Sequence, residues 1–541
     1  MKPQRLFIAL ALALLTLLGF AVFPGHTWLQ SDTQIYAPIL ERRVNAELFG
    51  REEIALRPHV TWTLYDEIAI GLRHVTGLEF KTLLQAQQLL FRFIGLTGAF
   101  LLAQALGLNV WGALLAAACF GLGATINGPA VLTMEYEPVP RGFAVLLLMG
   151  AIGCAAQRRW LGAGLLAGVA TLYHPTSTAP FYVCGLAHWL WSHDRREKLA
   201  FVIPLACSIA AVFLFAFLQP QVTERQVWFG RIDESLEKIQ RLRGAYNWIS
   251  QWPKPWLWQY PVLLGIVAAA WLRLRGAMTA EARFFALALP LFGMLTVPAQ
   301  YLMLDVGKWI LIPQFQPARA VLYITTFAVM LGVAAAWRAA AGGRRAEAAA
   351  WLVPVFAIPA NGLVVQLWTD LNWRRMALVL GLAAVTALAS SFRRSRALAP
   401  VMAVAAAFLI PGWGAMRNYP ALHTAELDQL SAWARESTRP DALFLFPDVH
   451  RGLQAGVFRA QARRALYVDW KSGGQANLLK GYGEEWWRRW QQVNQARAPL
   501  RPLAGYRAMG IDYLVVKPEN RPAGAAVVYA NKNWVVIALK P

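Results

Sequence analysis

The chain has 541 residues, of which 57% are hydrophobic and only 15% are charged. A soluble domain has about a quarter of its residues charged, so this composition excludes a soluble enzyme, a disordered protein and a coiled coil. The net charge of +22 would suggest nucleic acid in a soluble chain, but basic residues beside membrane helices explain it here, and we expect no nucleic-acid partner.

The first apolar run extends from Leu6 to Phe23 and follows Lys2 and Arg5. It resembles a signal peptide, but no small-residue cleavage site follows it, so we interpret it as an uncleaved membrane helix with its N-terminus inside. The next segment, 25–82, carries charge and has apolar residues at helical spacing. This pattern predicts helices that lie on the membrane surface.

Twelve further apolar runs follow, so we predict an α-helical polytopic membrane protein with about 13 transmembrane helices. With the N-terminus inside, the short inner segments hold 16 Lys and Arg, whereas the short outer loops hold four, in agreement with the positive-inside rule. The predicted membrane domain is 1–414, including the outer loops 25–82 and 219–255. The later runs are 83–106, 111–128, 142–156, 161–173, 180–191, 199–218, 256–272, 284–303, 319–337, 348–367, 376–390 and 397–414.

An odd number of spans places residues 415–541 outside. His423–Glu436 has the apolar period of a helix, and five short apolar segments after it have the pattern of strands. The segment therefore predicts a small α/β domain on the outer side. The predicted strands are 442–446, 465–468, 512–516, 525–529 and 534–537. The four cysteines of the chain all lie in apolar runs, which predicts neither disulfides nor a metal site.

Asp32 is the first candidate for chemistry, because it follows the first helix on the outer side. A carboxylate at a membrane surface can accept a proton from an attacking hydroxyl or amine. The alternative is a helix N-cap, in which Ser31 or Asp32 accepts backbone N–H bonds.

Two further outer loops add acids, a histidine and cations. Glu135 and Glu137 lie close to Arg141, so they are either functional or joined to it by an interfacial salt bridge. His174 precedes Pro175 on the same side, where it is either a catalyst or a capped turn residue. Arg319, at the start of a span, could bind an anion such as a lipid phosphate, whereas interfacial anchoring explains it equally well.

The outer α/β segment carries aromatic rings beside acids, in Tyr467, Asp469 and Trp470 and again around Trp486. Such rings suit the C–H faces of sugars. The alternative is an amphipathic helix that rests its Trp side on the membrane domain.

Four short motifs together resemble the C-type glycosyltransferases (GT-C), a superfamily of multispanning membrane enzymes, and within it a bacterial branch. They are Ser31–Tyr36, Arg57–Thr61, Glu135–Arg141 and Tyr173–Pro175. The likeness also includes an acid in the first outer loop, a second acidic outer loop, about a dozen spans and an outer C-terminal α/β domain. It implies a bacterial inner-membrane protein with a cytoplasmic N-terminus and a periplasmic C-terminal domain.

The resemblance implies that a sugar moves from a polyprenyl-phosphate donor to a periplasmic, lipid or glycan acceptor, with inversion at the anomeric carbon. Asp32 would be the general base, and Glu135, Glu137 and His174 would complete the catalytic group. The donor phosphate would bind Arg319, Lys308 and Arg141, and the acceptor would bind Tyr36, Tyr467, Asp469 and Trp470. No cofactor is required by this scheme, although a divalent metal ion held by the acidic loop is an alternative.

Two departures from the superfamily narrow this expectation. Asp32 is not part of an Asp-x-Asp pair, and the Trp-Trp-Asp element of oligosaccharyltransferases is missing, which argues against protein N-glycosylation. A transporter or flippase of lipid-linked substrates is the main rival, because Pro290, Pro354 and Pro359 could break helices. A non-catalytic assembly protein with the same fold is the second rival.

Overall fold

The computed structural model describes residues 3–56, 62–191, 198–218, 227–359, 363–366, 369–410, 422–494 and 500–539. Each of the 13 predicted apolar runs contains a helix, so the sequence-based prediction of a polytopic helical protein is confirmed. These helices are α1 Pro3–Ala21, α4 Phe80–Ala105, α5 Val110–Gly121, α6 Pro140–Ala156, α7 Trp160–Tyr173, α8 Pro175–Trp191, α9 Leu199–Leu218, α11 Lys254–Leu274, α12 Ala280–Gln300, α14 Leu322–Ala341, α15 Arg345–Ala357, α17 Trp373–Ser391 and α18 Ala399–Leu409.

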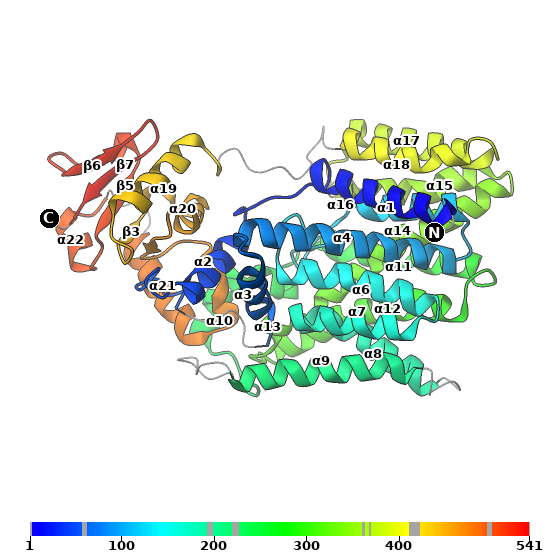
Figure 1. Cartoon of the computed structure of the whole chain (residues 1–541), viewed down its shortest axis with the longest axis horizontal. Coiled ribbons are helices and arrows are strands. Elements are labelled where there is room, and N and C mark those ends of the chain that lie inside the picture. Colours follow the sequence, from blue (N-terminus) through cyan, green and yellow to red (C-terminus); the bar gives the residue numbers. More distant parts are fainter. Residues whose placement is uncertain are drawn as a thin grey trace.

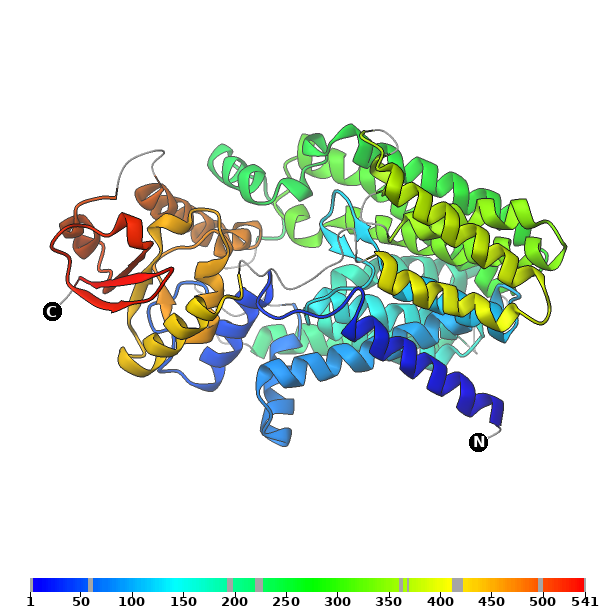
Figure 2. The same cartoon turned by 90° about the horizontal axis from the view of Figure 1, so that it is seen from above.

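Helix α14 is the centre of this bundle. It packs against α5, α11, α12, α15 and α17, and nearly all of its side chains are buried. Helix α1 is different, because it lies at the outer edge of the bundle and buries only Leu12 and Thr16 completely (Figure 2). Within the described ranges, seven helical stretches are long and apolar enough to cross a membrane, and several neighbours are shorter.

Helices α4 and α6 approach each other so closely that only glycine fits between them. A Cβ at Gly98 would lie 2.2 Å from the carbonyl oxygen of Met149, and a Cβ at Gly153 would lie 2.2 Å from the carbonyl oxygen of Gly98. Small residues permit such contacts between membrane helices, whose packing gains little from the hydrophobic effect inside a bilayer.

Two predicted spans are too long. In the run 348–367, helix α15 ends at Ala357, two residues before Pro359. The run 111–128 is helical only as far as Gly121, after which a short hairpin pairs β1 Thr125–Ile126 with β2 Val131–Leu132. Gly123 and Gly128 both adopt positive φ values, 71° and 98°, which favour glycine. Apolar composition predicted a continuous span here, whereas these two glycines allow the chain to leave the helix and turn back.

The outer segments form their own helices at one end of the bundle, where they meet the C-terminal part of the chain (Figure 1). The predicted surface segment 25–82 contains two of them. The helical elements of these segments are α2 Thr33–Val44, α3 Tyr65–Thr76, α10 Glu234–Arg243, η1 Ala245–Asn247, η2 Ile249–Gln251, the π-helix η3 Tyr301–Val306, α13 Ile312–Phe315, η4 Pro317–Val321 and α16 Leu363–Gln366.

Residues 422–539, called the C-terminal unit below, contain a five-stranded sheet of order β4-β3-β5-β7-β6. Strand β3 pairs in parallel with β4 and β5, whereas β7 is antiparallel to β5 and β6. All five predicted strands and the predicted first helix are present. The elements are α19 Ala425–Ser437, β3 Leu443–Leu445, α20 Gln454–Ala462, β4 Ala465–Leu466, η8 Ser472–Asn477, α21 Lys480–Val493, α22 Leu503–Ala508, β5 Tyr513–Val516, β6 Val527–Ala530 and β7 Val535–Ala538.

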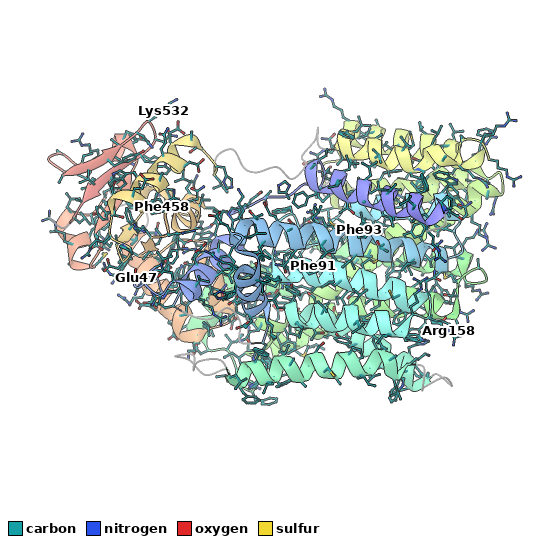
Figure 3. The ribbon with its side chains drawn as sticks, viewed as in Figure 1. Glu47, Phe91, Phe93, Arg158, Phe458 and Lys532 are labelled. Atoms are coloured by element: carbon teal, nitrogen blue, oxygen red, sulfur yellow. The ribbon has the colours of Figure 1, made fainter. Side chains whose placement is uncertain are left out.

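The core of the C-terminal unit continues into the outer segments. Ile35 and Ile39 of α2 and Ile239 of α10 are buried together with the strands of this unit. The unit is thereby attached to the first outer loop, which also carries Asp32. Figure 3 shows Lys532 of this unit and Arg158, which follows α6, at opposite ends of the molecule.

Candidate functional site

A cavity of about 590 Å³ lies where the outer segments meet the C-terminal unit. Its wall is built from α2, the turn between α7 and α8, α9, the end of α10, and segments 311–319 and 471–478. A concave site of this size, bounded by several elements, is typical of ligand binding. Five of the predicted site residues line it: Asp32, Tyr36, Arg141, His174 and Arg319.

Glu137 holds the start of α2 in place. Its carboxylate accepts hydrogen bonds from the backbone N–H groups of Gln30, Ser31 and Asp32 at 2.8–2.9 Å and from the Thr33 hydroxyl at 2.6 Å. A buried acid at a helix N-terminus satisfies donors that the helix itself leaves free. Glu137 therefore acts as the cap, and the Asp32 side chain makes no capping hydrogen bond, so the N-cap interpretation of Asp32 is wrong.

The Asp32 carboxylate instead faces two cations. Its Oδ2 accepts a hydrogen bond from an Arg141 NH group and its Oδ1 accepts one from Lys471 Nζ, each at 2.5 Å. Burial alone would raise the pKa of Asp32, but the charges of Lys471 and Arg141 outweigh it and hold this pKa far below its ordinary value. Asp32 is thus an ionised carboxylate held between two protein cations.

Arg141 also pairs with Glu135, an acid of its own loop, and so links Glu135 to Asp32. Its Nε donates to Glu135 Oε1 at 2.7 Å, which is the salt bridge that the sequence offered as one interpretation of this loop. Glu135 and Glu137 do not line the cavity, and both are almost completely buried. The two acids of this loop therefore hold Arg141 and the backbone of Asp32 in place and do not face the cavity.

Arg319 is a cation of the cavity without a counter-charge. In the part of the chain that the structure describes, its guanidinium forms no ion pair, and its buried Nε has no hydrogen-bond partner. Element η4 presents it to the cavity beside Gln316, whose φ of 48° turns the chain between α13 and η4. A half-buried guanidinium whose buried Nε lacks a partner fits an anionic ligand.

His174 and Tyr36 also line the cavity. The His174 Nδ1 accepts a hydrogen bond from the backbone N–H of Ser177 at 3.2 Å, which matches the capped-turn interpretation of this residue. Burial and the neighbouring Asp32 raise the pKa of Tyr36, so its hydroxyl stays protonated and able to donate.

Lys308 does not reach the cavity. Its Nζ lies 2.5 Å from Glu237 Oε1 and 4.8 Å from the ring centre of Trp248, within the outer segments. The structure therefore separates Lys308 from Arg319, although the sequence suggested both for one phosphate.

The three aromatic and acidic residues predicted for the acceptor lie behind the cavity wall. The Tyr467 hydroxyl donates to Gln492, Asp469 pairs with Arg459 at 2.8 Å, and Trp470 lies between the guanidinium groups of Arg243 and Arg451. None of the three is among the residues that line the described cavity.

The Trp side of α21 packs within the C-terminal unit and against α10. Trp486 and Trp490 are buried beside Trp470 in one apolar cluster with Ile35 of α2 and Ile239 of α10, so the Trp side of the helix rests on the outer loops of the predicted membrane domain. The motif Arg57–Thr61 lies outside the described residues.

Sequence reasoning missed two cations of the cavity, Lys471 and Arg243. Lys471 contacts Asp32, and Arg243 lies at the end of α10 with its guanidinium 4.0 Å from the Trp470 ring centre. The Arg243 Nε is buried without a hydrogen-bond partner in the described part of the chain. The only signal in the sequence was the position of Lys471 beside an aromatic and acidic motif, because folding alone brings 243 and 471 next to residue 32.

The acidic loop does not offer the donor set of a divalent metal ion. Its carboxylates are taken up by backbone N–H groups, a hydroxyl and Arg141. Among the described residues, no three His, Cys, Asp or Glu side chains gather as metal ligands do. The residues present here do not fit a metal of the kind that carboxylates bind through free oxygen atoms.

Comparisons with known proteins bear on both parts of the chain. Residues 425–493 match a family described as a domain of unknown function (DUF6798), and this stretch includes Lys471. A search of the curated proteins gave no match. The structure of arabinofuranosyltransferase AftD from Mycobacteria matches 99% of this chain at 15% identity and a TM-score of 0.48, and the chain spans 40% of AftD.

A second similar structure is that of ArnT from Cupriavidus metallidurans bound to undecaprenyl phosphate. It matches 100% of this chain and 99% of its own length, at 12% identity and a TM-score of 0.50. Because the match includes both the helical bundle and the C-terminal unit, it concerns the arrangement of the whole molecule. The chain is a multi-pass membrane protein whose fold is similar to that of ArnT over its whole length.

Proposed function

We propose that the protein is a membrane glycosyltransferase that moves a sugar from a polyprenyl-phosphate donor to a hydroxyl or amine acceptor. The transfer takes place at the outer face of the membrane that holds the protein. The observation that carries the proposal is the composition of the cavity. Asp32 is its one carboxylate among the described lining residues, and it shares the cavity with Arg141, Arg243, Arg319 and Lys471. This excess of positive charge favours an anionic ligand.

Part of the cavity wall is apolar. Ile209, Val212 and Phe213 of α9 line it, together with Trp62 and Trp228. The same helix exposes other large apolar side chains, among them Phe217 with 81% of its surface accessible, as expected of a helix that faces lipid. An amphipathic ligand with a phosphate and a long prenyl chain fits a cavity whose wall carries both cationic and apolar side chains.

The chemistry follows from the groups in the cavity. Asp32 takes the proton of the acceptor, whose oxygen or nitrogen forms a bond with the anomeric carbon of the sugar. The bond between that carbon and the phosphate oxygen breaks, and the polyprenyl phosphate leaves with the electron pair. Attack opposite the leaving group inverts the anomeric configuration. Arg319 and Arg243 stabilise the negative charge that grows on the phosphate.

The rival functions receive less support from the helices. Pro290 and Pro354 lie inside the continuous helices α12 and α15, so neither marks a break of the kind that transporters use at mid-membrane. Pro359 lies two residues after the end of α15, inside the predicted span 348–367, so of the three prolines this one does mark the end of a helix. Arg92, a charged residue inside α4, donates to the backbone carbonyls of Gly19, Gly25 and Glu135, which is a structural role.

The test is to incubate the purified protein, in lipid nanodiscs or liposomes, with radiolabelled polyprenyl-phosphate sugars and bacterial membrane extract. We expect label to move from the donor lipid to an acceptor, with release of polyprenyl phosphate. Label that crosses a liposome membrane but stays on the donor would instead identify a flippase. Absence of both transfer and crossing across a panel of sugars would favour the assembly protein.

A further inference from the structure

The C-terminal unit contributes Lys471 to the cavity. Once a donor is bound, this lysine can pair with either of two anionic groups, the Asp32 carboxylate or the donor phosphate. We propose that Lys471 exchanges from Asp32 to the phosphate of the donor, so that Asp32 becomes an effective base only in the donor complex. The inference rests on the proposed function, because it assumes a phosphate in this cavity, and it adds a residue that contacts both the base and the ligand.

Of the two cations on Asp32, Arg141 is fixed and Lys471 is not. Arg141 is also paired with the buried Glu135, so it stays neutralised and anchored whatever happens at Asp32. Lys471 Nζ has Asp32 as its acidic partner at 2.5 Å and otherwise donates to the Ser31 hydroxyl at 2.7 Å. A new anion in the cavity therefore competes for Lys471 rather than for Arg141.

The backbone of Lys471 is firmly attached to the first outer loop. Its N–H donates to Asp469 Oδ2 at 3.0 Å, and Asp469 Oδ1 pairs with the fully buried Arg459 at 2.8 Å. Arg459 in turn donates to the carbonyl oxygen of Gln34 in α2 at 2.9 Å. Because this chain of bonds fixes the main chain on both sides, the exchange needs only rotation of the flexible four-carbon lysine side chain.

Two other cations mark where the phosphate would lie. Arg319 and Arg243 line the same cavity, and each has a buried Nε without a hydrogen-bond partner in the described part of the chain. The backbone carbonyl of Lys471 accepts a hydrogen bond from the Arg243 guanidinium at 3.5 Å, so this lysine and this arginine are neighbours. A phosphate held by Arg319 and Arg243 is thus within the same group of side chains as Lys471.

Exchange would change the basicity of Asp32. The charged and titratable groups around it are Arg141 and Glu137 from the loop before α6, Tyr36 on its own helix, Arg319 from η4, and Lys471. Two close cations make Asp32 a weak base, because they stabilise the carboxylate. When Lys471 leaves, one close cation remains and the pKa of Asp32 rises towards the working pH.

The first test measures binding of undecaprenyl phosphate to the purified full-length protein in nanodiscs. Lys471→Gln should weaken this binding by about tenfold or more, whereas Lys471→Arg, which keeps the charge, should retain most of it. The matched control is Lys480→Gln in the same unit, because Lys480 pairs with Asp233 outside the cavity. Thermal unfolding of each variant shows whether it is folded. Binding by folded Lys471→Gln at the parent affinity would overturn the inference.

The second test compares the pH dependence of kcat/KM for the donor, which reports the free protein, with that of kcat, which reports the donor complex. In the parent, the acidic limb of the pH profile should lie at lower pH for kcat/KM than for kcat, because Lys471 pairs with Asp32 only in the free protein. In Lys471→Gln the acidic limbs of the two profiles should coincide. Limbs that coincide in the parent would contradict the exchange. Phosphate binding that depends on Lys471, without sugar transfer by the parent, would overturn the proposed function and support the phosphate contact of Lys471.

Discussion

Glu137 and Asp32 are two acids of one cluster with different tasks. Glu137 uses both oxygen atoms to hold the backbone of residues 30–32, whereas Asp32 turns its carboxylate into the cavity. The cap places Asp32 at a defined point, because the backbone that carries it is fixed on the side of the bundle. A change at Glu137 should therefore affect both stability and the position of Asp32.

Glu137→Gln tests this role. The amide keeps the shape of the side chain but offers one acceptor oxygen in place of two, so at least one backbone N–H loses its partner. We expect a loss of about 1–3 kcal/mol in unfolding free energy and a reduced rate of transfer. Thermal unfolding and the transfer assay check this. Thr33→Val removes the hydroxyl that donates to Glu137 and accepts from the Leu29 N–H, so it should lower stability while the bonds of Glu137 to the backbone of residues 30–32 stay in place. Unchanged stability of Glu137→Gln would contradict the capping role.

Arg319 is the residue-scale test of donor binding. Loss of a charge-assisted hydrogen bond in Arg319→Ala should cost about 1.5–3 kcal/mol, which raises the donor KM by about 10- to 150-fold. Arg319→Lys keeps the charge but not the planar fork, and should fall between Ala and the parent. The acceptor KM should not change. Arg241→Ala is the control, because Arg241 pairs with Glu237 away from the cavity. Normal donor KM in both Arg319 variants would make this residue an interfacial anchor.

At the scale of elements, the contact of α4 with α6 positions the acidic loop that leads into α6. Gly98→Ala places a methyl group 2.2 Å from the Met149 carbonyl oxygen, so the helices must separate. We expect a melting temperature several degrees lower than that of the parent. Gly265→Ala in α11 is the matched control, because a Cβ there meets nothing within 4 Å. Equal melting temperatures of the two variants would show that the close contact carries no stability.

Most elements could be predicted from the sequence, because apolar period and composition act locally. The strands of the C-terminal unit and the helices of the bundle follow from such patterns, whereas the run 111–128 was extended past its glycine turn and the run 348–367 past the end of α15 at Ala357. The site was harder to predict. Asp32 and Arg319 were found from their place at span ends, whereas Arg243 and Lys471 belong to segments that only tertiary structure brings to Asp32.

The predicted acceptor residues show the other limit of the sequence. Tyr467, Asp469 and Trp470 have the composition of a sugar site, but their side chains are used to hold the C-terminal unit together. Composition cannot distinguish an aromatic group that faces a cavity from one that packs inside a core. Asp469 still acts near the site, because it fixes the backbone of Lys471.

At the scale of the whole molecule, the account requires the cavity and the C-terminal unit on the outer side of the membrane. Arg158 and Lys532 lie at opposite ends of the structure (Figure 3). In a variant without the four native cysteines, Lys532→Cys should react with a membrane-impermeant maleimide in cells with a permeable outer membrane. Arg158→Cys should react only after the inner membrane is opened. A reporter fused after Pro541 should be active only if it works in the periplasm. The reverse pattern would overturn the topology.

The measurement that tests the central claim most directly is the rate of sugar transfer by Asp32→Asn with the donor that the parent uses. Asparagine has nearly the same shape but accepts no proton, so the rate should fall by about 10²–10⁴-fold while the protein stays folded. Asp233→Asn, which changes an acid outside the cavity that also pairs with a lysine, should transfer at the parent rate. Transfer by Asp32→Asn at the parent rate would contradict the account.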